Sequence, residues 1–509
     1  MPTSSSNFKR AIGVLLHPSA LPLSPVFGSF GSPAREWVKF LAKHRIGVWQ
    51  FLPLAPCDST GSPYSSPSSF AFNPFFLDAE ELVNKGFLSS SLIDQLPGND
   101  SNKSSISFLL AEERSVALGR FLREEWKKQD LAIKHEFNYW CQQQYWLEDH
   151  ILFMELRRQF NGLPWWKWPK PFAQRNPVFI YLWRIKNKDN LLEHSLLQWH
   201  LDRQWNSLRK LARQLGVLMF GDMPFYVSRD SADVWSKRSL FSIQANGELK
   251  HQSGVPPDYF SETGQLWGTP VYLWKRHQLT RFKWWRKRFS RHLQQVDLLR
   301  LDHFRALESY WSVPGDKNNA IDGTWEPSPG VELLQLLQKD CGGSLPLVAE
   351  DLGVITPQVE NLRDQFGLPG MKILQFGFNG DSNNPYFPPN IKGDGWVVYT
   401  GTHDNPTTLS WWNSLDQEKK ELVNNISNDS NRSPVWKLID IGLGTDAKIF
   451  IAPMQDLLSL DNKSRFNTPG TIGDNWNWRL KEFDSAVLEA LKDYGVRGSF
   501  WERSLEKEE

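Results

Sequence analysis

Short apolar runs bounded by turn residues recur along the 509-residue chain, and amphipathic segments lie between many of them. This alternation is typical of parallel strands joined by helical crossovers. Eight such runs predict strands at residues 12–16, 46–54, 217–227, 296–304, 345–352, 371–378, 396–402 and 449–454. Eight parallel strands with crossover helices predict an α/β fold, namely a (β/α)8 TIM barrel with large, mostly helical insertions.

Two of the predicted crossover helices have clear signals in the sequence. Ser32 and Pro33 form a helix start, after which Trp37 and Leu41 recur at helical spacing. A second helix is predicted from about residue 329 to residue 339, where four leucines follow a valine. Both helices follow a predicted strand, as a βα unit requires.

The chain is longer than one barrel needs, because this fold usually takes about 250 residues. We expect a single catalytic barrel domain over residues 1–509, with the surplus in insertions. Residues 57–216 open with a loop-like stretch and become mostly helical, which predicts an inserted helical subdomain after the second strand. Residues 228–295 predict a second insertion after the third strand.

Charge and composition exclude several classes of protein. The 58 basic and 57 acidic side chains are interspersed, which argues against a nucleic-acid or anionic-membrane partner. No apolar run approaches the roughly 18 residues of a membrane span, and the run before His17 is short for a signal segment. The three cysteines are widely separated, which predicts that they are reduced thiols rather than disulfides or metal ligands. A soluble, cytoplasmic protein is predicted.

The chain contains 25 tryptophans, and two clusters of them allow two interpretations. The clusters are WWKWPKP, with Trp165, Trp166 and Trp168, and FKWWRKRF, with Trp284 and Trp285. Their rings could form surface platforms for sugar, or they could pack the insertions onto the barrel. The sequence favours packing.

Carboxylates lie at the ends of four predicted strands, where barrel enzymes carry their chemistry. They are Asp222 in MFGDMPFYV, Asp302 in LRLDHFR, Glu350 in PLVAEDLG and Asp404 in YTGTHDN. Glycoside chemistry needs such a group, with one carboxyl as acid, a second as nucleophile and further charge for an oxocarbenium-like transition state. Asp302, Glu350 and Asp404 could fill these roles.

Two alternatives for these carboxylates remain open. Each could be a structural ion-pair partner, as Asp302 could be for Arg300 or Arg305. They could also bind a divalent metal together with His303 and His403, although no D-x-D-x-D-G loop is present. Four carboxylates at corresponding strand ends favour the catalytic interpretation over both.

An ordered series of motifs spans nearly the whole chain. It comprises GVLLHPSALPL, FLPLAPCDSTGSPYSSPSSFAFNP, GDMPFYVSRDSADVW, GVPPDYFSETGQLWG, RLDHFR, VAEDLGVITPQV, GMKILQFGF, YTGTHDN and RFNTPGTIGDNWNWRL. With this series the chain resembles the 4-α-glucanotransferases, also called amylomaltases or disproportionating enzymes, of the α-amylase clan. The resemblance implies transfer of an α-1,4-glucan segment to a 4-hydroxyl of glucose or a glucan by a retaining double displacement.

On matching positions, the resemblance implies that Asp302 is the nucleophile, Glu350 the general acid/base and Asp404 the transition-state stabiliser. It implies no cofactor and no metal. The donors would be α-1,4-glucans, and the acceptors would be glucose or maltooligosaccharides. The implied substrate-binding residues are Tyr64, His403 and Asn467, together with Asp258, Tyr259 and Trp267 of a loop that covers bound glucan. Arg300 lies two residues before Asp302 on the same strand face and could orient the nucleophile, and Asp222 is a further candidate.

The sequence also departs from the family pattern. It has WGTP for WGNP, PPN at residues 388–390 for PHN, Pro406 after HDN, and a polar DKNNAIDGTWEPSPG before the fifth strand. These changes spare the three carboxylates and concern subsite preference. A glucan hydrolase is the runner-up interpretation, because the carboxylates alone do not choose between water and a sugar hydroxyl. A glucan-binding protein without activity is a third.

Overall fold

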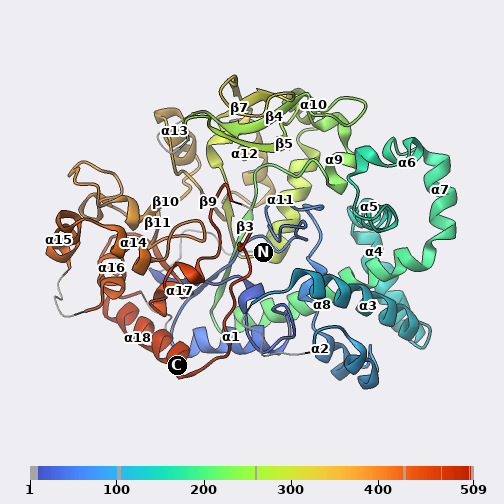
Figure 1. The fold of residues 1–509 in the computed structure, drawn as a ribbon, viewed down its shortest axis with the longest axis horizontal. Helices are drawn as coiled ribbons and strands as arrows, with labels where there is room; N and C mark the ends of the chain where they lie inside the picture. The colour runs from blue at the N-terminus through green and yellow to red at the C-terminus, as the bar shows by residue number, and fades with distance from the viewer. Residues whose placement is uncertain are drawn as a thin grey trace.

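The computed structural model describes residues 10–99, 105–257, 261–427, 432–471, 473–503 and 505 (Figure 1). Eight parallel strands form one sheet in the order β10-β11-β12-β1-β2-β3-β6-β9. The strands are β1 (Ala11–Leu15), β2 (Val48–Gln50), β3 (Leu218–Met223), β6 (Leu298–Leu301), β9 (Leu347–Ala349), β10 (Gly370–Ile373), β11 (Trp396–Tyr399) and β12 (Ile449–Pro453). The amide of Ala349 donates to the carbonyl oxygen of Pro369 (2.8 Å), so the two edge strands meet. The predicted TIM barrel is confirmed.

All eight predicted strands are present, and all except β1 are shorter than their apolar runs. Residues 51 and 52 show why, because they follow β2 and stay buried in the loops above the barrel. Strands β6 and β12 are buried along their whole length. Parallel strands covered by helices have no solvent face, which explains runs that do not alternate.

Helices surround the barrel (Figure 1). Helix α1 begins at Ser32 with Pro33 in its first turn, buries Trp37 and Leu41, and ends at Lys43. Helix α12 spans Gly330–Asp340, so both helices predicted in detail are confirmed. The other helices after barrel strands are α11 (Lys283–Gln295), α13 (Pro357–Gln365), α14 (Thr408–Ser414), α15 (Gln417–Ile426), α16 (Pro434–Leu443), α17 (Met454–Leu457) and α18 (Ser485–Phe500).

Between β2 and β3 the described chain opens with a loop and then becomes mostly helical, and much of it forms a lobe beside the barrel (Figure 1). The helices are α2 (Ala79–Asn84), α3 (Phe108–Trp126), α4 (Leu131–Gln143), α5 (Leu147–Gln159), α6 (Lys170–Ala173), α7 (Pro177–Lys186) and α8 (Lys188–Gln214). Helix α8 packs against α3 and α5 of the lobe and also against α1 and β3 of the barrel. It therefore joins the two parts.

A second, antiparallel sheet lies beside the barrel and was not predicted. Its order is β5-β4-β7-β8, with β4 (His251–Val255), β5 (Gln265–Pro270), β7 (Ser309–Pro314) and β8 (Thr324–Pro327). The polar segment flagged before the fifth strand contains β8, all of whose residues are exposed. Besides β4 and β5, residues 228–295 contain the short helices α9 (Ala232–Ser236) and α10 (Trp274–Leu279) and the longer helix α11.

The two tryptophan clusters are mainly part of the core. Trp165, Trp168, Trp284 and Trp285 are buried. The indole of Trp165 donates to the carbonyl oxygen of Arg229 (2.8 Å), which joins the helical lobe to the segment after β3. Packing, rather than surface binding of sugar, is therefore confirmed for these four rings. None of the helices in the described ranges is long and apolar enough to cross a membrane.

Candidate active site

The carboxyl ends of the parallel strands bring the four predicted carboxylates to one end of the barrel. Asp222 lies in β3, Asp302 follows β6, and Glu350 follows β9. These three strands are neighbours in the sheet. Asp404 lies in the loop after β11. This is the end at which barrel enzymes hold their substrates.

One buried guanidinium connects two of the carboxylates. The Arg300 Nη1 atom lies 2.7 Å from Asp222 Oδ2 and 2.9 Å from Asp302 Oδ1. Arg300 and Asp302 share a side of the chain because they are two residues apart at the end of a strand. The Asp222 side chain is only 1% exposed, whereas the Asp302 side chain is 31% exposed and open to a ligand.

The ion-pair alternative is thus correct for Arg300 and wrong for Arg305. The Arg305 guanidinium donates to the carbonyl oxygen of Val354 and lies 3.8 Å from the ring centre of Trp325. Asp302 is therefore held by a cation that Asp222 shares.

Tyr64 and His403 form a second layer around Asp222. The Tyr64 hydroxyl donates to Asp222 Oδ2 (2.8 Å) and lies 3.0 Å from His403 Nε2. The two rings stack with 5.4 Å between centroids and 9° between planes. Burial raises the pKa of Asp222 to about 7 and lowers the pKa of His403. Asp222 therefore holds Arg300 and Tyr64, and its contact with a sugar stays a prediction.

Glu350 is held by main-chain donors. The amide of His303 donates to Glu350 Oε2 (2.6 Å), and the amide of Leu352 donates to Oε1 (3.2 Å). His303 has a left-handed backbone (φ 52°), an unusual conformation for this residue type. Burial raises the pKa of Glu350 to about 7. A carboxyl with this pKa can both give and take a proton near neutral pH.

Asp404 is fixed by a segment from far along the chain. The Asn467 amide nitrogen donates to Asp404 Oδ1 (2.6 Å), and His403 Nε2 lies 3.3 Å from the same oxygen. Arg465 donates to the main-chain oxygen of Asp404. The RFNTPG motif thus packs on the THDN loop, and the Asp404 side chain stays 42% exposed.

Trp267 reaches the site from the second sheet. Its ring is 38% exposed and meets the ring of His303 edge-on, with 4.8 Å between centroids. The buried ring of Tyr226 lies behind both, 6.0 Å from Trp267 and 6.3 Å from His303. Of the predicted site residues, only Asp258 and Tyr259 lie outside the described residues.

The arrangement matches carboxylate chemistry better than metal binding. Within the described parts of the chain, no three His, Cys, Asp or Glu side chains come together as the ligands of a metal ion would. The carboxylate oxygens instead face a guanidinium, a phenol, an amide or main-chain N–H groups. This geometry gives the metal alternative no support.

A family model described as 4-alpha-glucanotransferase matches residues 16–485. The chain belongs to the 4-alpha-glucanotransferase family. The 4-alpha-glucanotransferase of Synechocystis sp. is 43% identical, over 96% of this chain and 98% of that protein. The enzyme of the same name from Thermus thermophilus is 39% identical, over 92% and 95%.

A solved structure of the family agrees. The amylomaltase of Streptococcus agalactiae, in complex with acarbose, superposes with a TM-score of 0.92 at 32% identity. The match covers 98% of this chain and 100% of that one. The chain is therefore an enzyme with 4-alpha-glucanotransferase activity, and neither the hydrolase nor the non-catalytic interpretation is favoured.

Two contributors to the site could not be found as functional from the sequence. His303 was considered only as a possible metal neighbour, yet its main-chain amide holds Glu350. Its left-handed backbone has no signature in RLDHFR. Arg465 was passed over, although it directly precedes the FNTPG residues that gave Asn467 its family match.

Proposed function

We propose that the enzyme transfers a segment of an α-1,4-glucan to the 4-hydroxyl of glucose or a maltooligosaccharide by a retaining double displacement. The observation that carries the proposal is the difference between two neighbouring carboxyl groups. Asp302 is partly exposed and ion-paired, whereas Glu350 is buried with a pKa raised to about 7. Two carboxyl groups in unlike environments can act as nucleophile and acid.

In the first step, an Asp302 oxygen attacks the anomeric carbon of the donor. The bond from that carbon to the 4-oxygen breaks, and Glu350 gives its proton to the leaving oxygen. The ion pair with Arg300 fixes the direction of the attacking carboxylate. The product is a glucosyl ester of Asp302 and a shortened glucan.

In the second step, the acceptor's 4-hydroxyl attacks the same carbon from the side that the first product left. Glu350, now a carboxylate, takes the hydroxyl proton, and the ester bond to Asp302 breaks. Two inversions give net retention. The raised pKa of Glu350 suits it to both directions of proton transfer.

The remaining site residues would stabilise and bind the sugar. Asp404 would face the positive charge that develops on the ring, and its contacts with Asn467 and His403 hold it in place. Tyr64 and Trp267 would offer aromatic surface to the glucan. Asp258 and Tyr259 would belong to the covering loop that excludes water and so favours transfer over hydrolysis.

The test is a product ladder from the purified enzyme and maltotriose. Glucose together with glucans longer than maltotriose, at constant total reducing ends, is the expected result. Reducing ends that rise steadily would instead indicate hydrolysis. Asp302→Asn should abolish the ladder, while Asp364→Asn, at a residue 62% exposed on α13, should leave it unchanged.

A further inference from the structure

The loop of residues 400–408, which carries His403 and Asp404, is closed at its base by one buried carboxylate. Asp456, in α17 directly after β12, accepts hydrogen bonds on Oδ2 from the hydroxyls of Thr400 (2.6 Å) and Thr408 (2.7 Å). Its Oδ1 accepts from the amide of Thr408 (2.7 Å). A single side chain therefore joins the first and the last residue of the loop.

The neighbouring residue of α17 holds the other segment that meets Asp404. The Gln455 amide nitrogen donates to the carbonyl oxygen of Ser464 (3.2 Å), next to Arg465. Arg465 and Asn467 in turn contact the main chain and the side chain of Asp404. The two segments that meet at Asp404, residues 400–408 and residues 464–467, are thus held by the adjacent residues Gln455 and Asp456.

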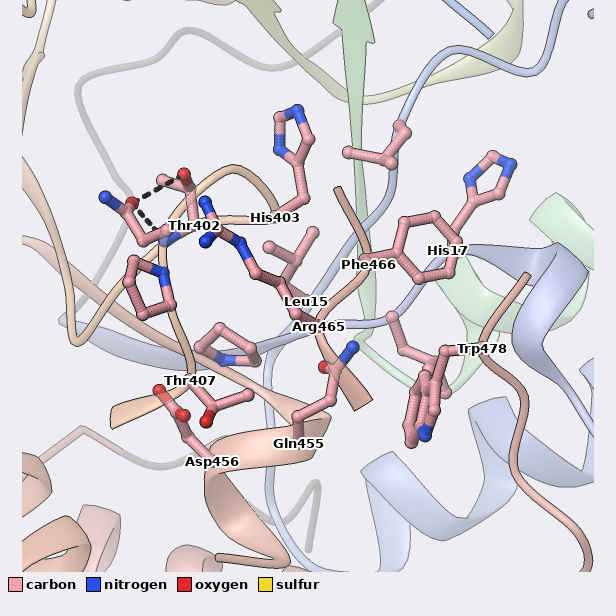
Figure 2. Close-up of a pocket in the computed structure, with 15 residues that line it drawn as sticks. Leu15, His17, Thr402, His403, Thr407, Gln455, Asp456, Arg465, Phe466 and Trp478 are labelled. Atoms are coloured by element: carbon pink, nitrogen blue, oxygen red, sulfur yellow. Dashed lines mark hydrogen bonds between the residues drawn. The ribbon is translucent and has the colours of Figure 1, made fainter. Parts of the chain in front are cut away.

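Close packing does not replace these hydrogen bonds. A cavity of about 30 Å³ lies between the loop and the end of β12. Figure 2 shows Thr402, His403 and Thr407 around it, with Gln455 and Asp456 at its base. A space of this size admits water, so the loop does not rest on a tightly packed layer here. Its position depends on its polar contacts.

Asp456 is buried beneath the loop, and three donors share its carboxylate. Its side chain is 2% exposed, Thr400 and Thr408 are fully buried, and two hydroxyls and one amide are its hydrogen-bond donors. Burying a carboxylate is unfavourable unless its hydrogen bonds are made, and its removal would leave two hydroxyls and one amide buried without their acceptor. What the carboxylate adds is a fixed geometry for the two ends of the loop.

We propose that Asp456 is a positioning residue for the transfer reaction, because its clamp on Thr400 and Thr408 sets where the Asp404 carboxylate lies against the reacting sugar. This inference rests on the role proposed for Asp404. Misplacing a catalytic group by about 1 Å can lower the rate by about 100-fold, so a clamp at the base of the loop can control turnover. Substrate affinity depends on other residues.

The test removes the clamp one hydroxyl at a time. Thr400→Val and Thr408→Val keep the side-chain shape and should lower kcat for maltotriose by about tenfold to 100-fold, with little change in KM. Thr400→Ser restores the hydroxyl and should restore kcat. Thr445→Val is the matched control, because its hydroxyl, also buried, donates to Gly442 (2.8 Å) on the turn before β12.

The outcomes separate this inference from the proposed function. Wild-type kcat in folded Thr400→Val and Thr408→Val would overturn the clamp, as would a loss of kcat no larger than that of Thr445→Val. Asp404→Asn is run in parallel, and wild-type turnover there would instead refute the role of Asp404. If the valine variants do not fold, Thr400→Ala is measured, which removes the same hydroxyl with less bulk. Unchanged kcat in that variant would also overturn the clamp.

Discussion

Replacing Glu350 by glutamine should remove proton transfer while keeping the shape of the site. The amides of His303 and Leu352 donate to different oxygens of the carboxylate, so one of them can still donate to the single glutamine oxygen. A positioned general acid/base contributes about 100-fold to 10,000-fold, so turnover of maltotriose should fall by that factor. Because burial raises the pKa of Glu350 to about 7, the wild-type kcat/KM should also fall about tenfold per pH unit well above pH 7.

The assay compares two donors that differ in their need for a proton. Maltotriose has a poor leaving group and needs the acid, whereas α-maltosyl fluoride releases fluoride without protonation. Glu350→Gln should therefore lose activity with maltotriose but keep most of its initial fluoride release. With the fluoride donor, the rate of fluoride release should show no decline above pH 7 in either protein.

Equal losses with both donors would refute the assignment of Glu350 as the acid. A wild-type rate on maltotriose that stays constant from pH 7 to pH 9 would refute the pKa argument, because about 99% of the group would be ionised at the upper end. Glu332→Gln, at an exposed position on α12 that contacts Gln278, is the control and should change neither profile.

Further predictions concern stability and binding. The pKa of Glu350 rises from 4.5 to about 7 on folding, so the contribution of this group to stability is lost as the pH rises between these values. In thermal unfolding, Glu350→Gln should be up to about 3 kcal/mol more stable than wild type above pH 7, and this difference should be absent below pH 4. Tyr64→Phe should lower kcat/KM by about tenfold to 100-fold through a lost hydrogen bond to a charged group, while Tyr272→Phe should leave rates unchanged. Asn467→Ala should lower kcat more than KM, since it frees Asp404.

The barrel was predictable because its strands are buried on both faces. A continuous apolar run such as that of β12 leaves few alternatives once turn residues bound it. Their exact ends were not predictable, because the loops at the mouth are apolar as well. The division of the chain into a barrel and insertions at residues 57–216 and 228–295 stays a prediction.

The antiparallel sheet was missed for the opposite reason. Its strands are short and weakly apolar, as in HQSGV of β4 and TWEP of β8. A strand of this kind forms because its neighbours supply hydrogen bonds and its loops pack, and neither is visible in a local pattern. Trp267 was found only through its family motif, and its contact with His303 required the structure.

The carboxylates of the site were predictable because position at a strand end carries information. Their environments were not predictable, since Arg300 pairs with both Asp222 and Asp302 only because β3 and β6 are adjacent in the sheet. Asp456 gave no signal at all. Its importance follows from two threonines that lie 56 and 48 residues away along the chain.

The most direct test of the account is the mass of the peptide that contains Asp302, measured after Glu350→Gln enzyme is incubated with α-maltosyl fluoride and quenched in acid. The first step needs no acid with this donor, and the second lacks its base, so the covalent intermediate should accumulate. The expected peptide is heavier by one maltosyl unit, with the sugar on Asp302. An unmodified Asp302 peptide despite fluoride release, or the sugar on another residue, would contradict it.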